Sequence, residues 1–235
     1  MKIPPCNMEI EQVFLQLEQQ ECRSLCITST NSGEGVTSLA QALTERHLLA
    51  GYRTLLVDLN LQNPSLTALS FVTEPNKDKE PTPHYLALTL QDNVVLSGLP
   101  IPTDKANMME LRQPKNLKHH IEQWLTDFDK VIIDSSSLSQ LQVDSIPAQT
   151  VAGSCDGTIM VVLSGQTLQT EFKAAIESLE NNKANIIGHV FNDKYHPSLK
   201  NELCREIERL RFLPTRLSTK LISMINKNRF LSTVV

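Results

Sequence analysis

Residues 28–43 read TSTNSGEGVTSLAQAL, and the fold expected for the chain follows mainly from these residues. An apolar run at 24–29 leads into it as a predicted strand, and a helix is predicted over 37–50. Between the two, Gly33 and Gly35 permit positive φ angles and a close approach of the backbone to an anion. A strand, a glycine-rich loop and a helix in this order are typical of a phosphate-binding loop.

One position of this loop conflicts with phosphate chemistry. Val36 stands where phosphate-binding loops carry the lysine that grips the phosphates, and it offers only its backbone N–H. Thr37 is placed to offer its hydroxyl to Mg²⁺, and Ser38 is placed to serve the α-phosphate. The candidate nucleotide-binding residues are Asn31, Ser32, Gly33, Glu34, Gly35, Val36, Thr37, Ser38 and Asn192.

The remaining apolar runs predict a doubly wound α/β fold. Runs of Val, Ile and Leu alternate with amphipathic helical stretches, which is typical of a mostly parallel sheet with helices on both faces. Ligands of such folds bind beyond the carboxyl ends of the strands. Further strands are predicted at 54–59, 93–98, 130–135, 157–163 and 184–192, and further helices at 117–128 and 170–182.

Two aspartates are predicted at this ligand-binding edge of the sheet. Asp58 comes at the end of one buried run and Asp134 at the end of another, where a carboxylate faces the crevice. Carboxylates in these places hold Mg²⁺ in phosphoryl-transfer enzymes. Asp58 and Asp134 are therefore the candidate catalytic residues and, with Thr37, the candidate Mg²⁺ ligands.

The composition is that of an ordinary globular chain. The 235 residues are 40% hydrophobic and 20% charged, with a formal net charge of −4. No long basic run is present, so a nucleic-acid partner is not expected. No apolar run of about 18 residues occurs, and the odd, scattered cysteines indicate reduced thiols. We therefore expect a cytoplasmic protein.

The pattern from Thr28 to Asn192 resembles the bacterial tyrosine kinase (BY-kinase) branch of the ParA/MinD-type P-loop ATPases. That family's loop reads T-S-x-x-P-G-E-G-K-S/T-T, and its Walker A′ motif reads L-L-I-D-x-D-x-R-x-P-S. The chain keeps Thr28, Ser29, Gly33, Glu34, Gly35, Thr37, Leu55, Leu56, Asp58, Pro64 and Ser65. It departs at four places: Ser32 for the proline, Val36 for the lysine, Asn60 for the second aspartate and Gln62 for the arginine.

The resemblance implies a MinD-like P-loop NTPase fold that binds ATP or ADP with Mg²⁺, with an adenine contact from Asn192. It is also supported by the positions of Asp144 and Asp156. It implies a membrane partner, a polysaccharide chain-length regulator (polysaccharide co-polymerase) in capsule, biofilm or exopolysaccharide export. The protein would then lie in the cytoplasm, peripherally at the inner face of the membrane.

The departures from the family pattern include residues that the family uses for phosphoryl transfer. A cation about 4 Å from a phosphate charge contributes roughly 4 kcal/mol at an effective dielectric near 20, so its loss slows transfer about a thousandfold. The tail tyrosines that BY-kinases phosphorylate are absent, because Tyr195 is the last tyrosine. The family's E-x-x-R-x-x-R oligomerisation stretch is also unmatched, since Phe14 and Leu17 follow Glu11 as an amphipathic core face. We expect a catalytically degenerate, non-catalytic or weakly nucleotide-binding regulator.

Two alternatives stay open. The first is an active ATPase or tyrosine kinase with a displaced lysine. Lys130 should lie at the far end of its strand, whereas Lys194 follows Asn192 at the correct edge and is the better candidate. A partner subunit donating the cation, and self-association in general, also stay open. The second alternative is a positioning protein of the ParA/MinD type.

The predicted organisation is an N-terminal helical extension at 1–22, the α/β domain at 23–213 and a C-terminal helix or tail at 214–235. The proline-rich segment 73–84 is predicted to be a mobile loop. Residues 215–231 place apolar side chains at helical spacing beside four basic ones. We favour a helix that packs on the sheet or on a partner, with contact to an anionic membrane surface as the alternative.

Overall fold

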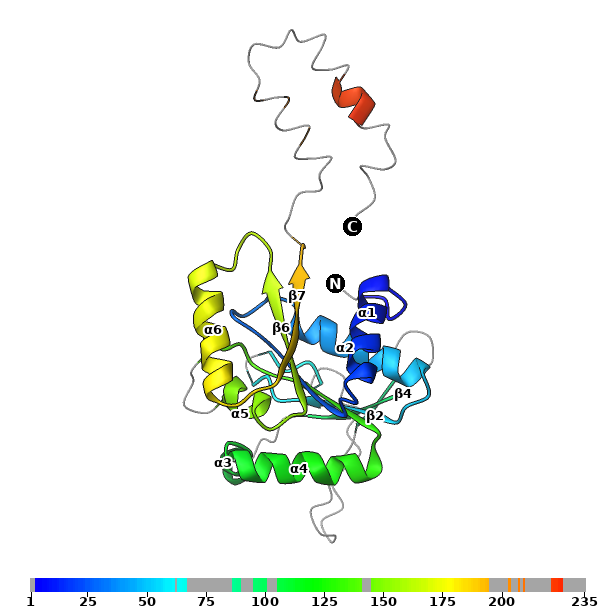
Figure 1. Ribbon diagram of the computed structural model, residues 1–235. Coiled ribbons are helices and arrows are strands. Elements are labelled where there is room, and N and C mark those ends of the chain that lie inside the picture. The colour runs from blue at the N-terminus through cyan, green and yellow to red at the C-terminus, as the bar shows by residue number, and fades with distance from the viewer. Residues whose placement is uncertain are drawn as a thin grey trace. The chain divides into compact units, whose positions relative to one another are not determined.

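The computed structural model describes residues 3–61, 63–66, 86–89, 95–100, 105–140, 145–194, 203, 207, 209 and 221–225. The chain forms two compact units, Met1–Asn192 and Asp193–Val235. The first unit holds the sheet and its helices (Figure 1). In the second unit, 221–225 form a short helix. The predicted boundary at 213/214, the 73–84 loop and most of the predicted C-terminal helix lie outside the described residues.

A single sheet organises the first unit, and its described strands run in the order β3-β4-β2-β5-β1-β6-β7. Neighbouring strands are parallel throughout except for the antiparallel pair of β3 and β4 at one edge. The predicted mostly parallel, doubly wound fold is thus confirmed. The strands are β1 Ser24–Ser29, β2 Thr54–Asp58, β3 Leu86–Thr89, β4 Val95–Leu99, β5 Lys130–Asp134, β6 Gly157–Leu163 and β7 Ile186–Asn192.

Helices cover both faces of this sheet (Figure 1). One face packs against α1 and α2, and the other against α3, α4, α5 and α6. The alternation of side chains along a strand explains the division: in β5, Val131 and Ile133 face one layer and Ile132 faces the other. The helices are α1 Met8–Gln19, α2 Val36–Leu49, α3 Lys105–Leu111, α4 Pro114–Asp127, α5 Ala148–Ala152 and α6 Gln169–Asn181.

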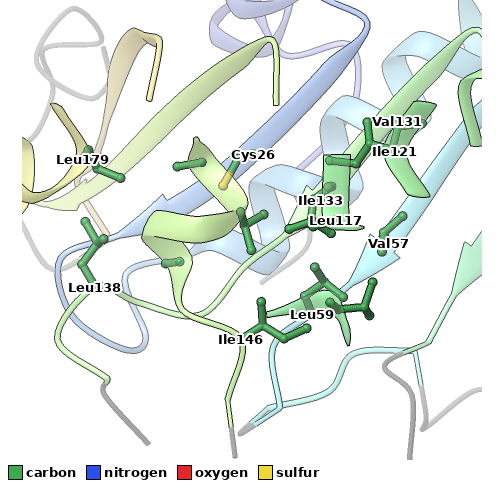
Figure 2. Packing of buried hydrophobic residues seen from close by; sticks show 14 of the residues in the cluster. Cys26, Val57, Leu59, Leu117, Ile121, Val131, Ile133, Leu138, Ile146 and Leu179 are labelled. Atoms are coloured by element: carbon green, nitrogen blue, oxygen red, sulfur yellow. The ribbon is translucent and has the colours of Figure 1, made fainter. Parts of the chain in front are cut away.

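The larger apolar cluster lies beneath α4 and its neighbours. Figure 2 shows Leu117 and Ile121 of α4 close to Val131 and Ile133 of β5. Both α4 residues are at most 2% exposed, so this helix buries one apolar stripe, as its sequence predicts. The packing fixes the strand ends that carry the functional residues.

Helix α1 belongs to the first unit and packs on α2. Phe14 and Leu17 are buried, which confirms the predicted core face. The guanidinium of Arg46 on α2 binds both carboxylate oxygens of Glu11, with an Nη2–Oε1 distance of 2.9 Å, and stacks over the Phe14 ring. Glu11 is therefore paired within the chain.

No helix among the described residues is long and apolar enough to cross a membrane.

Candidate functional site

Most of the predicted site residues lie at the carboxyl ends of three adjacent strands, β2, β5 and β1, whereas Asn192 ends β7, two strands further along the sheet. Parallel pairing sets Asp58 opposite Asp134 and Asp134 opposite Ile27, just before the glycine-rich loop. The two aspartates and the loop therefore share one edge of the sheet. This is the ligand-binding edge of doubly wound folds.

The loop from Thr30 to Gly35 has the backbone expected of a phosphate cradle. Gly33 and Gly35 have φ of 82° and 110°, in the region that favours glycine. Helix α2 begins directly after Gly35 and has no side-chain cap at its N-terminus. Its first amides are thus left to bind an anion with the help of the helix dipole.

Val36 is packed into the apolar core of the protein. Its side chain is 8% exposed and belongs to the apolar cluster between α1, α2 and the sheet. Ile27 of β1 and Leu39 of α2 are members of the same cluster. The position that should carry the phosphate-gripping charge is therefore part of the core.

Asp134 carries a buried carboxylate without a well-formed hydrogen bond. The residue is 0% exposed, and neither oxygen has a hydrogen-bond partner of good geometry among the described residues. Burial raises the pKa of Asp134 to about 7; the nearby Thr37 hydroxyl lowers it in part, and the charge of Asp58 raises it. A buried carboxylate beside a hydroxyl suits Mg²⁺, so Thr37 and Asp134 are the residues that would hold the ion.

Unlike Asp134, Asp58 accepts several hydrogen bonds through its carboxylate. Its Oδ1 accepts the amide of Asn60 at 3.0 Å, and its Oδ2 accepts the Ser65 hydroxyl at 3.0 Å and the Leu66 amide at 3.1 Å. The Ser65 amide also donates to Oδ2. The carboxylate thus organises the loop that follows β2, and its role toward Mg²⁺ or in catalysis stays a prediction.

Glu34 turns its side chain into the protein. It is 2% exposed; its Oε2 accepts the Thr30 amide at 3.1 Å and its Oε1 accepts the Thr167 hydroxyl at 2.6 Å. The amide of Asn192 donates to the Glu34 carbonyl at 2.7 Å. Glu34 and Asn192 therefore support the loop from behind, and the adenine contact of Asn192 stays a prediction.

The other loop residues lie toward the surface. Asn31 donates from Nδ2 to Glu171 at 3.0 Å, Ser32 is exposed, and Ser38 is partly exposed on the first turn of α2. All the candidate loop residues are thus brought together at one place. Their contacts to a nucleotide remain predictions.

Lys130 lies at the opposite end of its strand from Asp134, as predicted. Its Nζ contacts the Glu18 carboxylate of α1 and donates to the Cys22 carbonyl at 2.9 Å. It also lies 5.0 Å from the centre of the Tyr52 ring. Lys130 cannot replace the missing lysine, and Lys194 belongs to the second unit, so its role stays a prediction.

Sequence reasoning missed several polar groups beside the loop. The hydroxyls of Thr30, Ser136 and Ser137 are buried and have no hydrogen-bond partner among the described residues. The segment after β5 runs along the start of the loop, because the Leu138 amide donates to the Ser29 carbonyl at 2.8 Å. The run of three serines directly after Asp134 is the sequence feature that could have pointed to two of these hydroxyls. No comparable feature marks Thr167.

The doubly wound sheet, the glycine-rich loop before α2 and the strand-end aspartates define the fold of a MinD-like P-loop NTPase. No protein-family model matches the chain. It is 29% identical over 196 residues to the tyrosine-protein kinase CpsD of Streptococcus pneumoniae, covering 77% of this chain and 83% of that one. The resemblance to the BY-kinase branch of the P-loop ATPases is confirmed by this relative and by the tyrosine-protein kinase YwqD of Bacillus subtilis, at 25% identity over 80% of this chain and 77% of that one.

Solved structures support the fold. The kinase domain of the Escherichia coli tyrosine kinase ETK matches with a TM-score of 0.61 at 18% identity, over 77% of this chain and 71% of that one. Cobyrinic acid a,c-diamide synthase from Mycobacterium smegmatis, with bound ATP analogue and magnesium, matches with a TM-score of 0.58 at 19% identity, over 82% of each chain. At these identities the likeness concerns the fold alone.

Gly35→Ala should destabilise the protein more than Gly51→Ala. Both glycines have positive φ, at 110° and 90°, so alanine costs about 1–2 kcal/mol at either place. A Cβ at Gly51 would meet nothing within 4 Å, whereas at Gly35 it would lie 2.7 Å from Nδ2 of Asn192. Urea unfolding should show the larger loss for Gly35→Ala, and Asn192→Ala should relieve the excess. Equal losses in the two variants would contradict this packing.

Proposed function

We propose that the chain is a catalytically degenerate, BY-kinase-like protein that regulates capsule or exopolysaccharide biosynthesis and export without useful phosphoryl transfer. The observation that carries the proposal is the burial of Val36 in the apolar cluster, at the position of the phosphate-gripping lysine. The backbone of the cradle is retained, whereas the charge that neutralises the transferred phosphoryl group is missing.

The charges around the loop support weak nucleotide binding. Glu34, Asp58 and Asp134 are carboxylates that are at most 2% exposed, and all three lie in the loop or at its edge of the sheet. A triphosphate bound to the loop amides would face these acids without the loop lysine. Loop amides and Mg²⁺ at Thr37 and Asp134 favour binding, but the transition-state charge would lack its fixed cation.

The proposed partner is a membrane polysaccharide chain-length regulator, and the proposed location is the cytoplasmic face of the membrane. The similarity to tyrosine-protein kinase CpsD supports this placement. Glu11, which begins the stretch corresponding to the family's oligomerisation segment, is held by Arg46 of the same chain. Self-association, if it occurs, would then use a surface other than the Glu11 carboxylate.

Calorimetric titration of the full chain with ATP and Mg²⁺ tests the proposal. We expect a Kd of about 1 mM or weaker, which corresponds to a binding free energy of about −4 kcal/mol or smaller in magnitude. The same samples, examined by mass spectrometry after incubation, should contain no phosphotyrosine. Micromolar binding together with phosphotyrosine on the chain would favour the alternative of an active kinase with a displaced lysine.

A further inference from the structure

A hydrogen-bonded pair of side chains, the buried Glu34 and the half-buried Thr167, links the phosphate loop to the segment between β6 and α6. Thr167 lies in that segment, and its hydroxyl donates to Oε1 of Glu34 at 2.6 Å. The same hydroxyl oxygen accepts the Leu163 amide at 3.2 Å, which fixes its orientation at the end of β6. The Thr167 hydroxyl therefore donates its one hydrogen to the Glu34 side chain of the loop.

The Glu34 carboxylate connects the Thr167 hydroxyl to the backbone of the loop. Its second oxygen accepts the amide of Thr30 at 3.1 Å, so the carboxylate bridges the first residue of the loop and Thr167. Because Glu34 is 2% exposed and its bond to the Thr30 amide is buried, water offers little competition for that bond.

A second restraint acts on the same residue through its main chain. The Asn192 side chain donates to the Glu34 carbonyl at 2.7 Å, and the Asn192 carbonyl accepts the Ser164 amide at 3.0 Å. The end of β7 and the segment after β6 thus hold Glu34 from its carbonyl and from its carboxylate.

We propose that Thr167 is a positioning residue which, through Glu34, holds the phosphate loop in its anion-binding conformation in the absence of any ligand. The inference rests on the proposed function only in assigning the loop to phosphate binding. On this view, the Glu34 side chain is a part of the loop's support and does not contact the nucleotide.

Hydrogen exchange at the Thr30 amide of the ligand-free chain, followed by NMR, tests the proposal. In Thr167→Val, which keeps the shape but loses the hydroxyl, this amide should exchange at least about tenfold faster. Thr167→Ser keeps the donor and should restore the parent rate to within about twofold. Thr126→Val, which makes the same change on the exposed side of α4, should leave the Thr30 amide unchanged.

A double-mutant comparison separates a local effect from general unfolding. If Thr167 acts through Glu34, Thr167→Val should cause no further increase in exchange when Glu34 is already alanine. An equal increase in both backgrounds, or an unchanged Thr30 amide in Thr167→Val alone, would overturn the proposal. Because no nucleotide is present, either outcome is independent of whether the chain binds or hydrolyses ATP.

Discussion

A Val36→Lys chain should hydrolyse ATP at a rate on the order of a thousandfold above the unaltered chain. The lysine would place a cation beside the β- and γ-phosphates, which is worth roughly 4 kcal/mol of transition-state stabilisation at an effective dielectric near 20. The cradle amides, Thr37 and Asp134 are already in position at the same edge of the sheet. Release of labelled phosphate under saturating ATP and Mg²⁺ measures the gain.

The buried setting of Val36 requires a control for this gain. The stem of a lysine can occupy apolar surroundings while its ammonium group extends toward the loop, and Val36→Met provides an unbranched chain without the charge. We expect Val36→Met to turn over ATP no faster than the unaltered chain. If Val36→Lys folds, as judged by circular dichroism, yet turns over ATP no faster than Val36→Met, the proposal that the missing cation limits turnover is wrong.

Asp134→Asn should stabilise the protein increasingly as the pH rises from 4 to 8. The folded-state pKa of Asp134 is raised from 3.8 to about 7 by burial, so the folded chain retains a proton that the unfolded chain releases. Below about pH 4 both states are protonated and the carboxyl imposes no pH-dependent cost. Above that pH the stability of the unaltered chain falls, and the loss levels off above about pH 7.

The asparagine variant lacks this titration, so its advantage should grow with pH. A pKa rise from 3.8 to about 7 corresponds to up to about 4 kcal/mol of unfolding free energy between pH 4 and pH 8. Urea unfolding at pH 4, 6 and 8 measures the difference from the unaltered chain. Asp127→Asn, at an exposed position near the end of α4, is the matched control and should show no such trend. A difference that stays constant with pH would contradict the account of Asp134.

The long elements of the fold could be predicted because their patterns are strong. The strand predicted at 157–163 coincides with β6, and the helix predicted over 37–50 lies within one residue of α2 at both ends. The elements that were missed are short: β3 has four residues, α5 has five and α3 has seven. A helix of five or seven residues has at most about two turns, and a strand of four residues has only two side chains on each face. Hydrophobic periodicity cannot identify elements that short.

The site could be located from the sequence, but the contacts of its side chains could not. Strand ends and glycines placed Asp58, Asp134 and the loop at one edge, since parallel strands end together. The sequence did not reveal that Asp58 would accept donors from the loop after β2, or that Glu34 would bond Thr167, 133 positions away. Pairings of this kind depend on how loops fold back, and no local pattern encodes them.

We propose that the chain keeps a phosphate cradle without the cation needed to transfer a phosphoryl group. A crystal structure of the full chain grown with saturating Mg²⁺ and a non-hydrolysable ATP analogue tests it most directly. We predict either a loop without ligand, or phosphates bound by loop amides, Thr37 and Mg²⁺ alone. A γ-phosphate paired with a lysine or arginine from elsewhere in the chain, or from a neighbouring copy, would contradict the claim.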